Sequence, residues 1–341
     1  MPEQAAPASS PAPPAEQPGA GDSAATVLLA LAANVGIAVL KAFAGLFTGS
    51  AALLSEAAHS VGDSVTEVLL LTALRRSRRP ADKQHPFGHG KERYVWSLLA
   101  AVGILVFGAA YSFYEGMHTI LAGHEERTAA WVNYVVLAVS FALEAVSFTQ
   151  SFRQLRREAR HEVVTVRGYL RDPEDPTVKS VVLEDTAALI GLVLAFAGVG
   201  LHQLTGRVFW DGAAAVGIGA LLVAVAFTLL QTNMGLLIGK QANVRLVRRI
   251  RGYLEEQPEV EKMVDLLTMM VGTGRVLVCA RLDFDDNLSA AQLEHVCVRI
   301  DNGLRAEFTA LDEVFLEPVP RTDEGLRARV LARYGDILDR D

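Results

Sequence analysis

A histidine and an aspartate, His59 and Asp63, lie four residues apart inside the apolar run 51–74. On an α-helix, residues at this spacing project from one face, a turn apart. An imidazole nitrogen and a carboxylate oxygen placed in this way can hold one borderline-soft cation such as zinc. The alternative is a structural hydrogen bond between the two side chains. The pair is therefore a candidate metal site, and its spacing alone leaves the alternative open.

The apolar runs also hold other carboxyl groups, among them Glu144, Glu184 and Asp185. An ionisable group inside a membrane span costs about 2.5–3.5 kcal/mol on insertion scales, so each is a candidate functional residue. Adjacent side chains on a helix point about 100° apart, so we expect only one of Glu184 and Asp185 to face a metal site and the other to face a neighbouring helix or the interface. Glu144 is either a ligand or a buried acid hydrogen-bonded between helices.

A second cluster lies in the polar segment between two apolar runs and consists of Asp82, His85 and His89. Carboxylate and imidazole groups are suitable zinc ligands. Basic residues flank the cluster and partly offset its attraction for a cation, so contact with anionic lipid is the alternative.

Six apolar runs can position these groups, and each approaches or exceeds the roughly 20 residues that a helix needs to cross a hydrocarbon core. They are residues 25–47, 51–74, 97–121, 131–152, 181–204 and 212–238. The second run is the least apolar, and a water-soluble amphipathic helix is the alternative for it. We expect a bundle of six transmembrane helices over residues 24–239.

Basic residues gather in the segments between runs two and three, between runs four and five, and after run six. The positive-inside rule places these segments, and with six spans both termini, in the cytoplasm. Residues 1–23 are rich in Pro, Ala, Ser and Gly and are expected to form a disordered tail.

The chain becomes soluble in character after residue 239. Its pattern predicts a helix, two strands, a helix and a strand over residues 240–320, which is a small cytoplasmic α+β domain of order α-β-β-α-β. Residues 321–341 are expected to be a C-terminal tail. The fold class predicted is therefore an α-helical membrane protein with a small α+β domain.

Composition excludes several classes of function. The 341 residues carry a net charge of −7, which argues against a broad nucleic-acid surface. The two cysteines, Cys279 and Cys297, indicate neither a disulfide framework nor a thiolate zinc site. No phosphate-binding loop of the Gly-x-x-x-x-Gly-Lys-Ser/Thr type is present, so we expect no coupling to ATP and no organic cofactor. A membrane metallohydrolase is disfavoured because the His-Glu-x-x-His motif is absent.

The six runs, the in-span His59-Ser-Val-Gly-Asp63, the loop His85-Pro-Phe-Gly-His89-Gly-Lys, Asp185 and the α-β-β-α-β tail together resemble a cation diffusion facilitator. The segments Lys91-Glu-Arg-Tyr-Val-Trp-Ser and Leu183-Glu-Asp-Thr-Ala-Ala are most similar to the branch that holds the mitochondrial zinc transporter of eukaryotes. Because no targeting segment is evident, we expect a bacterial plasma membrane.

The resemblance implies a transport site with two ligands from the second span and two from the fifth, the latter also four residues apart. Three positions match, at His59, Asp63 and Asp185, whereas Val181 occupies the fourth. Three protein ligands would leave an open coordination position, unless Glu144 or Glu184 replaces the missing group. The resemblance also implies a loop site at Asp82, His85 and His89.

The resemblance implies that the tail forms a homodimer. The tail positions at which zinc-transporting members carry histidines are occupied by Val264, Arg281, Glu294 and Phe315. Asp265 and Glu317 then remain as isolated acids, so we expect a dimerisation domain without the usual zinc cluster.

The expected function is a secondary transporter, not an enzyme, that exports zinc or another divalent metal ion in exchange for protons. Proton exchange has a physical reason, because metal and protons compete for the same ligands. The alternative is a non-transporting membrane subunit or metal sensor with a degenerate site, which Val181 favours.

Overall fold

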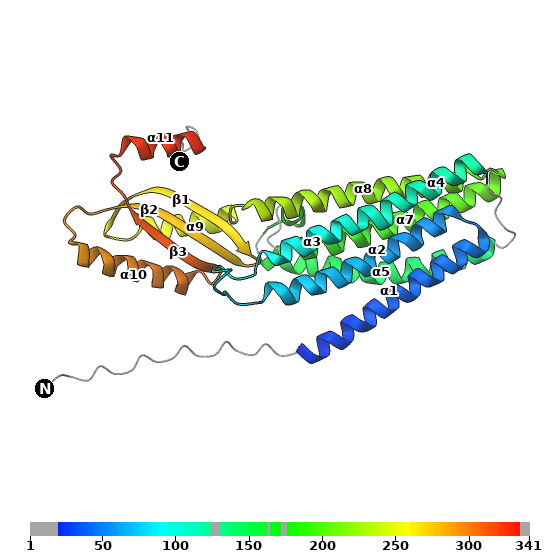
Figure 1. Cartoon of the computed structure of the whole chain (residues 1–341), viewed down its shortest axis with the longest axis horizontal. Coiled ribbons are helices and arrows are strands. Elements are labelled where there is room, and N and C mark those ends of the chain that lie inside the picture. Colours follow the sequence, from blue (N-terminus) through cyan, green and yellow to red (C-terminus); the bar gives the residue numbers. More distant parts are fainter. Residues whose placement is uncertain (1–19, 124–129, 162–163, 172–175, 335–341) are drawn as a thin grey trace.

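Six long helical segments lie side by side, and a small sheet domain lies beyond one end of them (Figure 1). This is a computed structural model, and it describes residues 20–123, 130–161, 164–171 and 176–334. The predicted tail 1–23 lies outside the described residues except for its last four, which belong to the first helix.

The long segments agree with the six apolar runs and extend beyond most of them. They are α1 (Ala20–Thr48), α2 (Ala51–Ser77), α3 (Glu92–Gly103) continued by the π-helix η1 (Ile104–Ala110) and α4 (Tyr111–Ala122), α5 (Ala130–His161), α7 (Pro176–Thr205) and α8 (Phe209–Ile238). A short helix, α6 (Val166–Arg171), which the sequence pattern did not predict, lies between α5 and α7.

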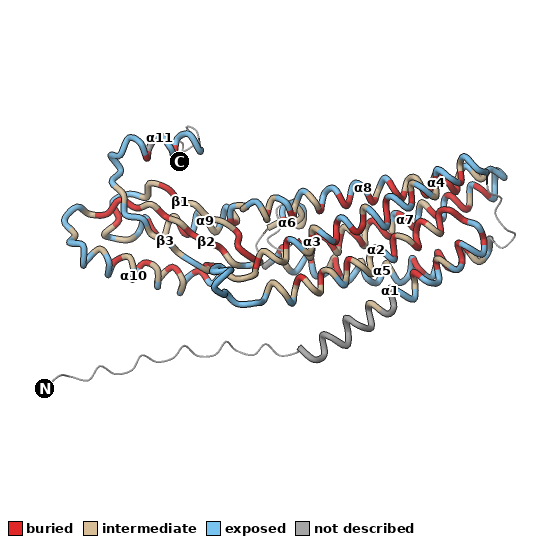
Figure 2. The backbone as a smooth tube through the Cα atoms, viewed as in Figure 1, coloured by how far each residue is buried: buried red, intermediate tan, exposed pale blue. Residues whose placement is uncertain are grey.

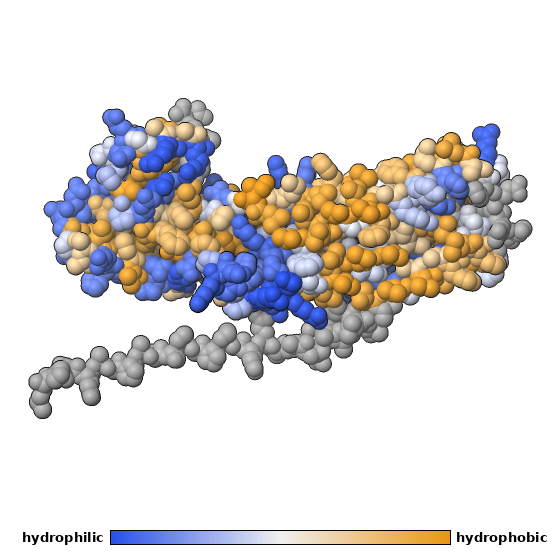
Figure 3. Space-filling model, in the orientation of Figure 1, coloured by the Kyte–Doolittle hydropathy of each residue, from blue (hydrophilic) through white to orange (hydrophobic). Residues whose placement is uncertain are grey.

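Four of these segments are long and apolar enough to cross a membrane among the described residues, namely Glu92–Ala122, Trp131–Arg160, Pro176–Thr205 and Phe209–Ile238. Within the part of α1 whose side chains the structure describes, Asn34–Thr48 is a shorter apolar helix. Apolar side chains cover much of the bundle surface in view, and hydrophilic ones gather where the bundle meets the sheet domain (Figure 3). The chain is thus an α-helical membrane protein, whereas six spans remain a prediction.

Buried hydrogen bonds fix the N-terminus of α2, which lies at the end of the bundle away from the sheet domain (Figure 1). Asp211, near the start of α8, accepts hydrogen bonds from the Ser50 hydroxyl at 2.8 Å and from the backbone N–H groups of Ala51 and Ala52. A carboxylate at a helix N-terminus satisfies donors that have no partner within the helix. Buried residues then follow the inner sides of α2, α7 and α8 (Figure 2).

Glycines allow α4 and α8 to approach closely. A Cβ on Gly116 would lie 2.7 Å from the backbone oxygen of Gly212. Small residues are typical of closely packed membrane helices. This contact supports the inner face of the bundle against which α2 packs.

The tail domain has the predicted order. It comprises α9 (Val244–Glu255), β1 (Val260–Gly272), β2 (Arg275–Phe284), α10 (Ala290–Glu307) and β3 (Leu311–Pro318). The sheet order is β1-β2-β3, with β1 antiparallel and β3 parallel to β2. The pairs Leu266↔Ala280 and Val278↔Val314 set the register, and α9 and α10 contribute Ile250 and Ile300 to the same core.

The structure differs from the expectation in the C-terminal segment and in the ion pairs of the tail domain. Residues 321–341 include a helix, α11 (Glu324–Tyr334), of which Leu326 and Val330 are buried. Asp265 is not an isolated acid, because it pairs with Arg281 at 3.2 Å and with Arg333 at 3.1 Å. Glu317 likewise pairs with Arg281, at 2.7 Å. The sequence pattern missed these pairs because they join strands and a helix distant in the chain.

Candidate metal-ion sites

A cavity of about 230 Å³ lies inside the helical bundle. Five carboxyl side chains are among the residues that line it: Asp63 and Glu67 from α2, Glu144 from α5, and Glu184 and Asp185 from α7. No lysine or arginine of the described chain is among the lining residues. Burying several acids together is unfavourable unless a cation or protons neutralise them. The cavity is therefore suited to a cation.

His59 and Asp63 lie next to each other on α2, with His59 Nδ1 3.5 Å from Asp63 Oδ1. His59 is 2% exposed, and its Nε2 atom is buried without a hydrogen-bond partner. Asp63 Oδ1 is also buried and has no hydrogen-bond partner. Asp63 lines the cavity, whereas His59 is not among the lining residues. The distance between His59 Nδ1 and Asp63 Oδ1 is longer than that of a usual hydrogen bond, and His59 Nε2 and Asp63 Oδ1 have no hydrogen-bond partners. Both features distinguish this pair from a tight structural hydrogen bond.

Glu184 and Asp185 both line the cavity, although the helical geometry predicted that only one would face the site. Asp185 is held by α5, because it accepts hydrogen bonds from the hydroxyls of Ser147 at 3.1 Å and Ser151 at 2.5 Å. Glu184 Oε1 is buried without a partner. The cavity spans more than one helical face, so adjacent carboxylates reach it in different directions. Val181, a turn before Asp185, lines it as well.

Glu144 is engaged by a buried lysine that sequence reasoning missed. Lys41 of α1 is fully buried, and its Nζ lies 3.2 Å from Glu56 Oε2 and 3.9 Å from Glu144 Oε1. The signal in the sequence is a lysine inside the first apolar run. A second missed contact is the hydrogen bond from Asn34 to Glu67, at 3.2 Å.

The loop cluster is more compact than the cavity residues. Among the described residues, only Asp82, His85 and His89 form a group of three possible ligands whose atoms all lie within 4.8 Å of one another. Asp82 Oδ1 lies 3.2 Å from His85 Nδ1, and Asp82 Oδ2 lies 3.1 Å from His89 Nε2. The hydrogen bonds from His89 and from the backbone N–H of His85 hold the pKa of Asp82 well below its usual range.

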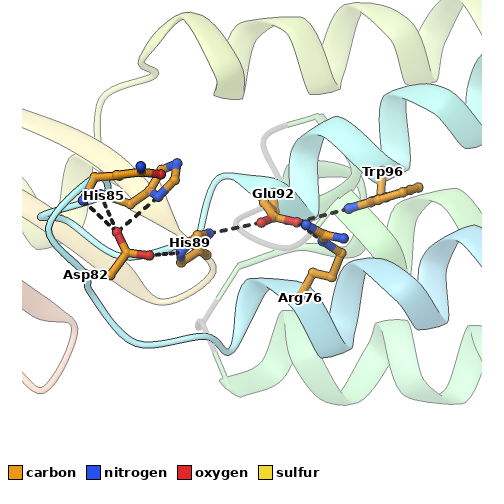
Figure 4. Close-up of polar contacts among 7 residues, drawn as sticks. Arg76, Asp82, His85, His89, Glu92 and Trp96 are labelled. Atoms are coloured by element: carbon orange, nitrogen blue, oxygen red, sulfur yellow. Dashed lines mark hydrogen bonds and ion pairs between the residues drawn. The ribbon is translucent and has the colours of Figure 1, made fainter.

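Glu92 extends this cluster towards the bundle (Figure 4). It contacts His89 Nδ1 at 3.0 Å, and its other oxygen accepts hydrogen bonds from Arg76 at 2.5 Å and from Trp96 at 3.2 Å. The sequence pattern grouped the histidines but gave no reason to include Glu92. On the other side, the Arg275 guanidinium donates to the backbone oxygen of Phe87 at 3.4 Å, so the loop also contacts the tail domain.

Comparison with known proteins agrees with these features. The sequence profile of the cation efflux transmembrane domain matches residues 27–238. The chain belongs to this family. This confirms the resemblance to cation diffusion facilitators.

Family relatives include the mouse "Proton-coupled zinc antiporter SLC30A9, mitochondrial", 33% identical over 76% of this chain and 46% of that protein. "Metal tolerance protein C4" of Arabidopsis thaliana is 28% identical over 85% of this chain and 61% of its own length. "Manganese efflux system protein MneP" of Bacillus subtilis is 23% identical over 87% of this chain and 96% of its own length. The chain spans about half the length of the zinc antiporter relatives that it matches.

Proposed function

We propose that this family member is a secondary transporter that exports zinc, or another divalent transition metal ion such as manganese, from the cytoplasm in exchange for protons. The observation that supports it best is the intramembrane cavity with its five carboxyl groups and unsatisfied buried atoms. Relatives named for zinc antiport and manganese efflux support the substrate class.

The transport site in this proposal consists of His59, Asp63 and Asp185, with Glu184 as the fourth ligand. Glu184 is favoured over Glu144 because its Oε1 atom is buried without a partner, whereas Glu144 lies beside Lys41. One imidazole and three carboxylates are a borderline-to-hard donor set, which suits zinc and also manganese. The cavity residues must shift on binding, because their ligand atoms are not clustered within 4.8 Å.

Proton exchange follows from the same ligands. Imidazole and carboxylate groups bind a metal ion only when they are deprotonated, so metal binding displaces protons. If the cavity opens alternately to the two sides of the membrane, metal and protons move in opposite directions. The mouse relative carries "Proton-coupled" in its name, which supports this part of the proposal.

The arrangement in the membrane is also a proposal. The basic segments between the spans support a cytoplasmic location of both termini and of the tail domain. We place the protein in a bacterial plasma membrane and expect it to form a homodimer through the tail. The loop residues Asp82, His85 and His89 form an accessory metal site at the cytoplasmic side.

The test is zinc and manganese uptake into proteoliposomes that contain the purified full chain. Asp63→Ala and His59→Ala are expected to abolish uptake while the protein remains folded. Thr72→Ala is the matched control on α2, because the Thr72 hydroxyl bonds only its own helix at Val68 and does not line the cavity. Uptake at the control level in both site variants would refute the assignment.

A non-transporting metal sensor is the second candidate, because Val181 stands in the cavity at the position of a ligand. Wild-type protein that binds zinc at the cavity but gives no flux of any divalent ion would support this candidate and refute transport.

A further inference from the structure

Lys41 is a buried charge that the proposed transport site does not use. Its side chain is 0% exposed, and its ammonium group donates to Ser60 Oγ at 2.9 Å and to Glu56 Oε2 at 3.2 Å. Glu144 Oε1 is the third oxygen, at 3.9 Å. A lysine is rarely buried unless acids are close to it, and one inside a membrane bundle indicates a function.

The lysine reaches the cavity wall without entering the cavity. Ser60 and Glu144 line the cavity, whereas Lys41 is not a lining residue. On the far side, Glu56 Oε1 lies against Gly191 of α7, in the space that a Cβ at that position would occupy. The hydrogen bonds to Glu56 and Ser60 hold the lysine beside Glu144.

The position of Lys41 affects Glu144 differently from the other acids of the cavity. Glu184 and Asp63 have buried oxygen atoms without partners, whereas Glu144 lies beside a fixed positive charge. A carboxylate beside an ammonium group is attracted to it, and it loses part of this attraction if it turns towards a second cation. The ammonium group also repels that second cation. Lys41 thus opposes ligation by Glu144.

We propose that Lys41 is a positioning residue that holds Glu144 away from the transported ion and thereby sets the affinity and metal preference of the site. This inference rests on the proposed function. Without Lys41, Glu144 supplies an additional carboxylate oxygen. Oxygen ligands suit manganese better than zinc, so the loss of Lys41 strengthens manganese binding more than zinc binding. A more tightly held ion also leaves more slowly.

The experiment measures zinc and manganese dissociation constants of the purified full chain by titration, together with uptake into proteoliposomes. Lys41→Met removes the charge and keeps most of the side-chain volume. It is made in a Glu56→Gln background, so that no unpaired Glu56 carboxylate remains, and is compared with Glu56→Gln alone. Lys41→Arg retains a cation, and adding Glu144→Gln to the double variant removes the released ligand.

We expect Lys41→Met/Glu56→Gln to bind manganese about tenfold more tightly than Glu56→Gln, with a smaller gain for zinc and slower uptake at saturating metal. Adding Glu144→Gln should return the manganese constant to the Glu56→Gln value, and Lys41→Arg should match the wild type. A merely structural lysine would not give a gain in affinity that Glu144→Gln reverses.

Unchanged or weaker manganese binding in the folded double variant would overturn the inference. If that variant does not fold, Glu144→Gln in the wild-type background decides, because a tenfold loss of zinc affinity there would make Glu144 a ligand despite Lys41. The proposed function fails separately, namely if Asp63→Ala retains wild-type zinc affinity and uptake.

Discussion

The bundle cavity and the loop between α2 and α3 offer similar ligand types in opposite electrostatic situations. In the loop, every member of the Asp82, His85 and His89 cluster contacts another member within 3.2 Å, and Asp82 and His85 are exposed. In the cavity, Asp63 Oδ1 and Glu184 Oε1 are buried without hydrogen-bond partners. The loop is satisfied without an ion, whereas the cavity is not.

This difference suits the loop to metal binding and the cavity to metal transport in the proposed function. A cluster whose ligands already bond one another must give up those bonds to take a metal ion, so it suits an accessory site with modest affinity. A cavity in which Asp63 and Glu184 have buried oxygen atoms without partners favours the binding of protons or a cation. Exchange of one for the other is what a metal–proton antiporter needs, so the cavity is the transport site that we propose.

The largest effect is expected for Asp63→Asn. The amide keeps the shape of the side chain but removes its charge, so zinc affinity at the cavity should fall by about 100-fold or more. Isothermal titration of the purified protein, made with Asp82→Asn as a common background to silence the loop, measures the change. If Asp63→Asn bound zinc as tightly as the Asp82→Asn background, the cavity would not be the stronger zinc site, and the contrast between cavity and loop would fail.

A smaller effect is expected when the support of Asp185 is removed. Ser151→Ala deletes the hydroxyl that donates to Asp185 Oδ2 at 2.5 Å, and loss of such a supporting bond costs about tenfold in metal affinity. Thr149→Ala is the matched control, because the Thr149 hydroxyl bonds the backbone of its own helix and the residue does not line the cavity. Equal zinc affinity in the two variants would mean that the Ser151 bond does not support a zinc ligand.

Val181→His distinguishes an open site from one completed by Glu184. Val181 and Asp185 share a helical face, so an added imidazole can reach an ion that Asp185 holds. If Glu184 already fills the fourth position, zinc affinity should change by less than about threefold, and Glu184→Gln should weaken binding about tenfold. A strong gain from Val181→His with a silent Glu184→Gln would show an open site instead.

The smallest effect on uptake is expected for Asp82→Asn in the loop. Zinc uptake at neutral pH should fall by less than about threefold, because the transported ion does not need this cluster at each cycle. Loss of uptake comparable to that of Asp63→Ala would place the loop on the transport path.

The pH response of the loop follows from Asp82. Its pKa is lowered by the hydrogen bonds from His89 and His85, so the stabilisation by Asp82 is complete above the ordinary pKa of an unfolded aspartate and is lost as the pH falls from there through the lowered pKa, in strongly acidic solution. A zinc-free Asp82→Asn variant should therefore have a lower thermal midpoint than the wild type at both neutral and mildly acidic pH. A difference that vanishes at mildly acidic pH would contradict the lowered pKa.

Local sequence patterns predicted the six long helical segments, the tail order and the loop cluster because each depends on residues close in the chain. The apolar runs give the bundle, and Asp82, His85 and His89 lie within eight residues of one another. The role of Lys41 was not predictable in this way, because its partner Glu144 comes from a distant helix. The ion pair between Arg333 and Asp265 was missed for the same reason.

The central claim, exchange of a divalent metal ion for protons through the cavity, is tested most directly by recording internal pH and internal zinc together in proteoliposomes. A zinc gradient applied to the wild-type protein should drive zinc inward and protons outward in a constant ratio, and Asp63→Ala should abolish both fluxes. Zinc flux without proton movement would contradict the exchange, and coupled fluxes that persist in Asp63→Ala would contradict the site.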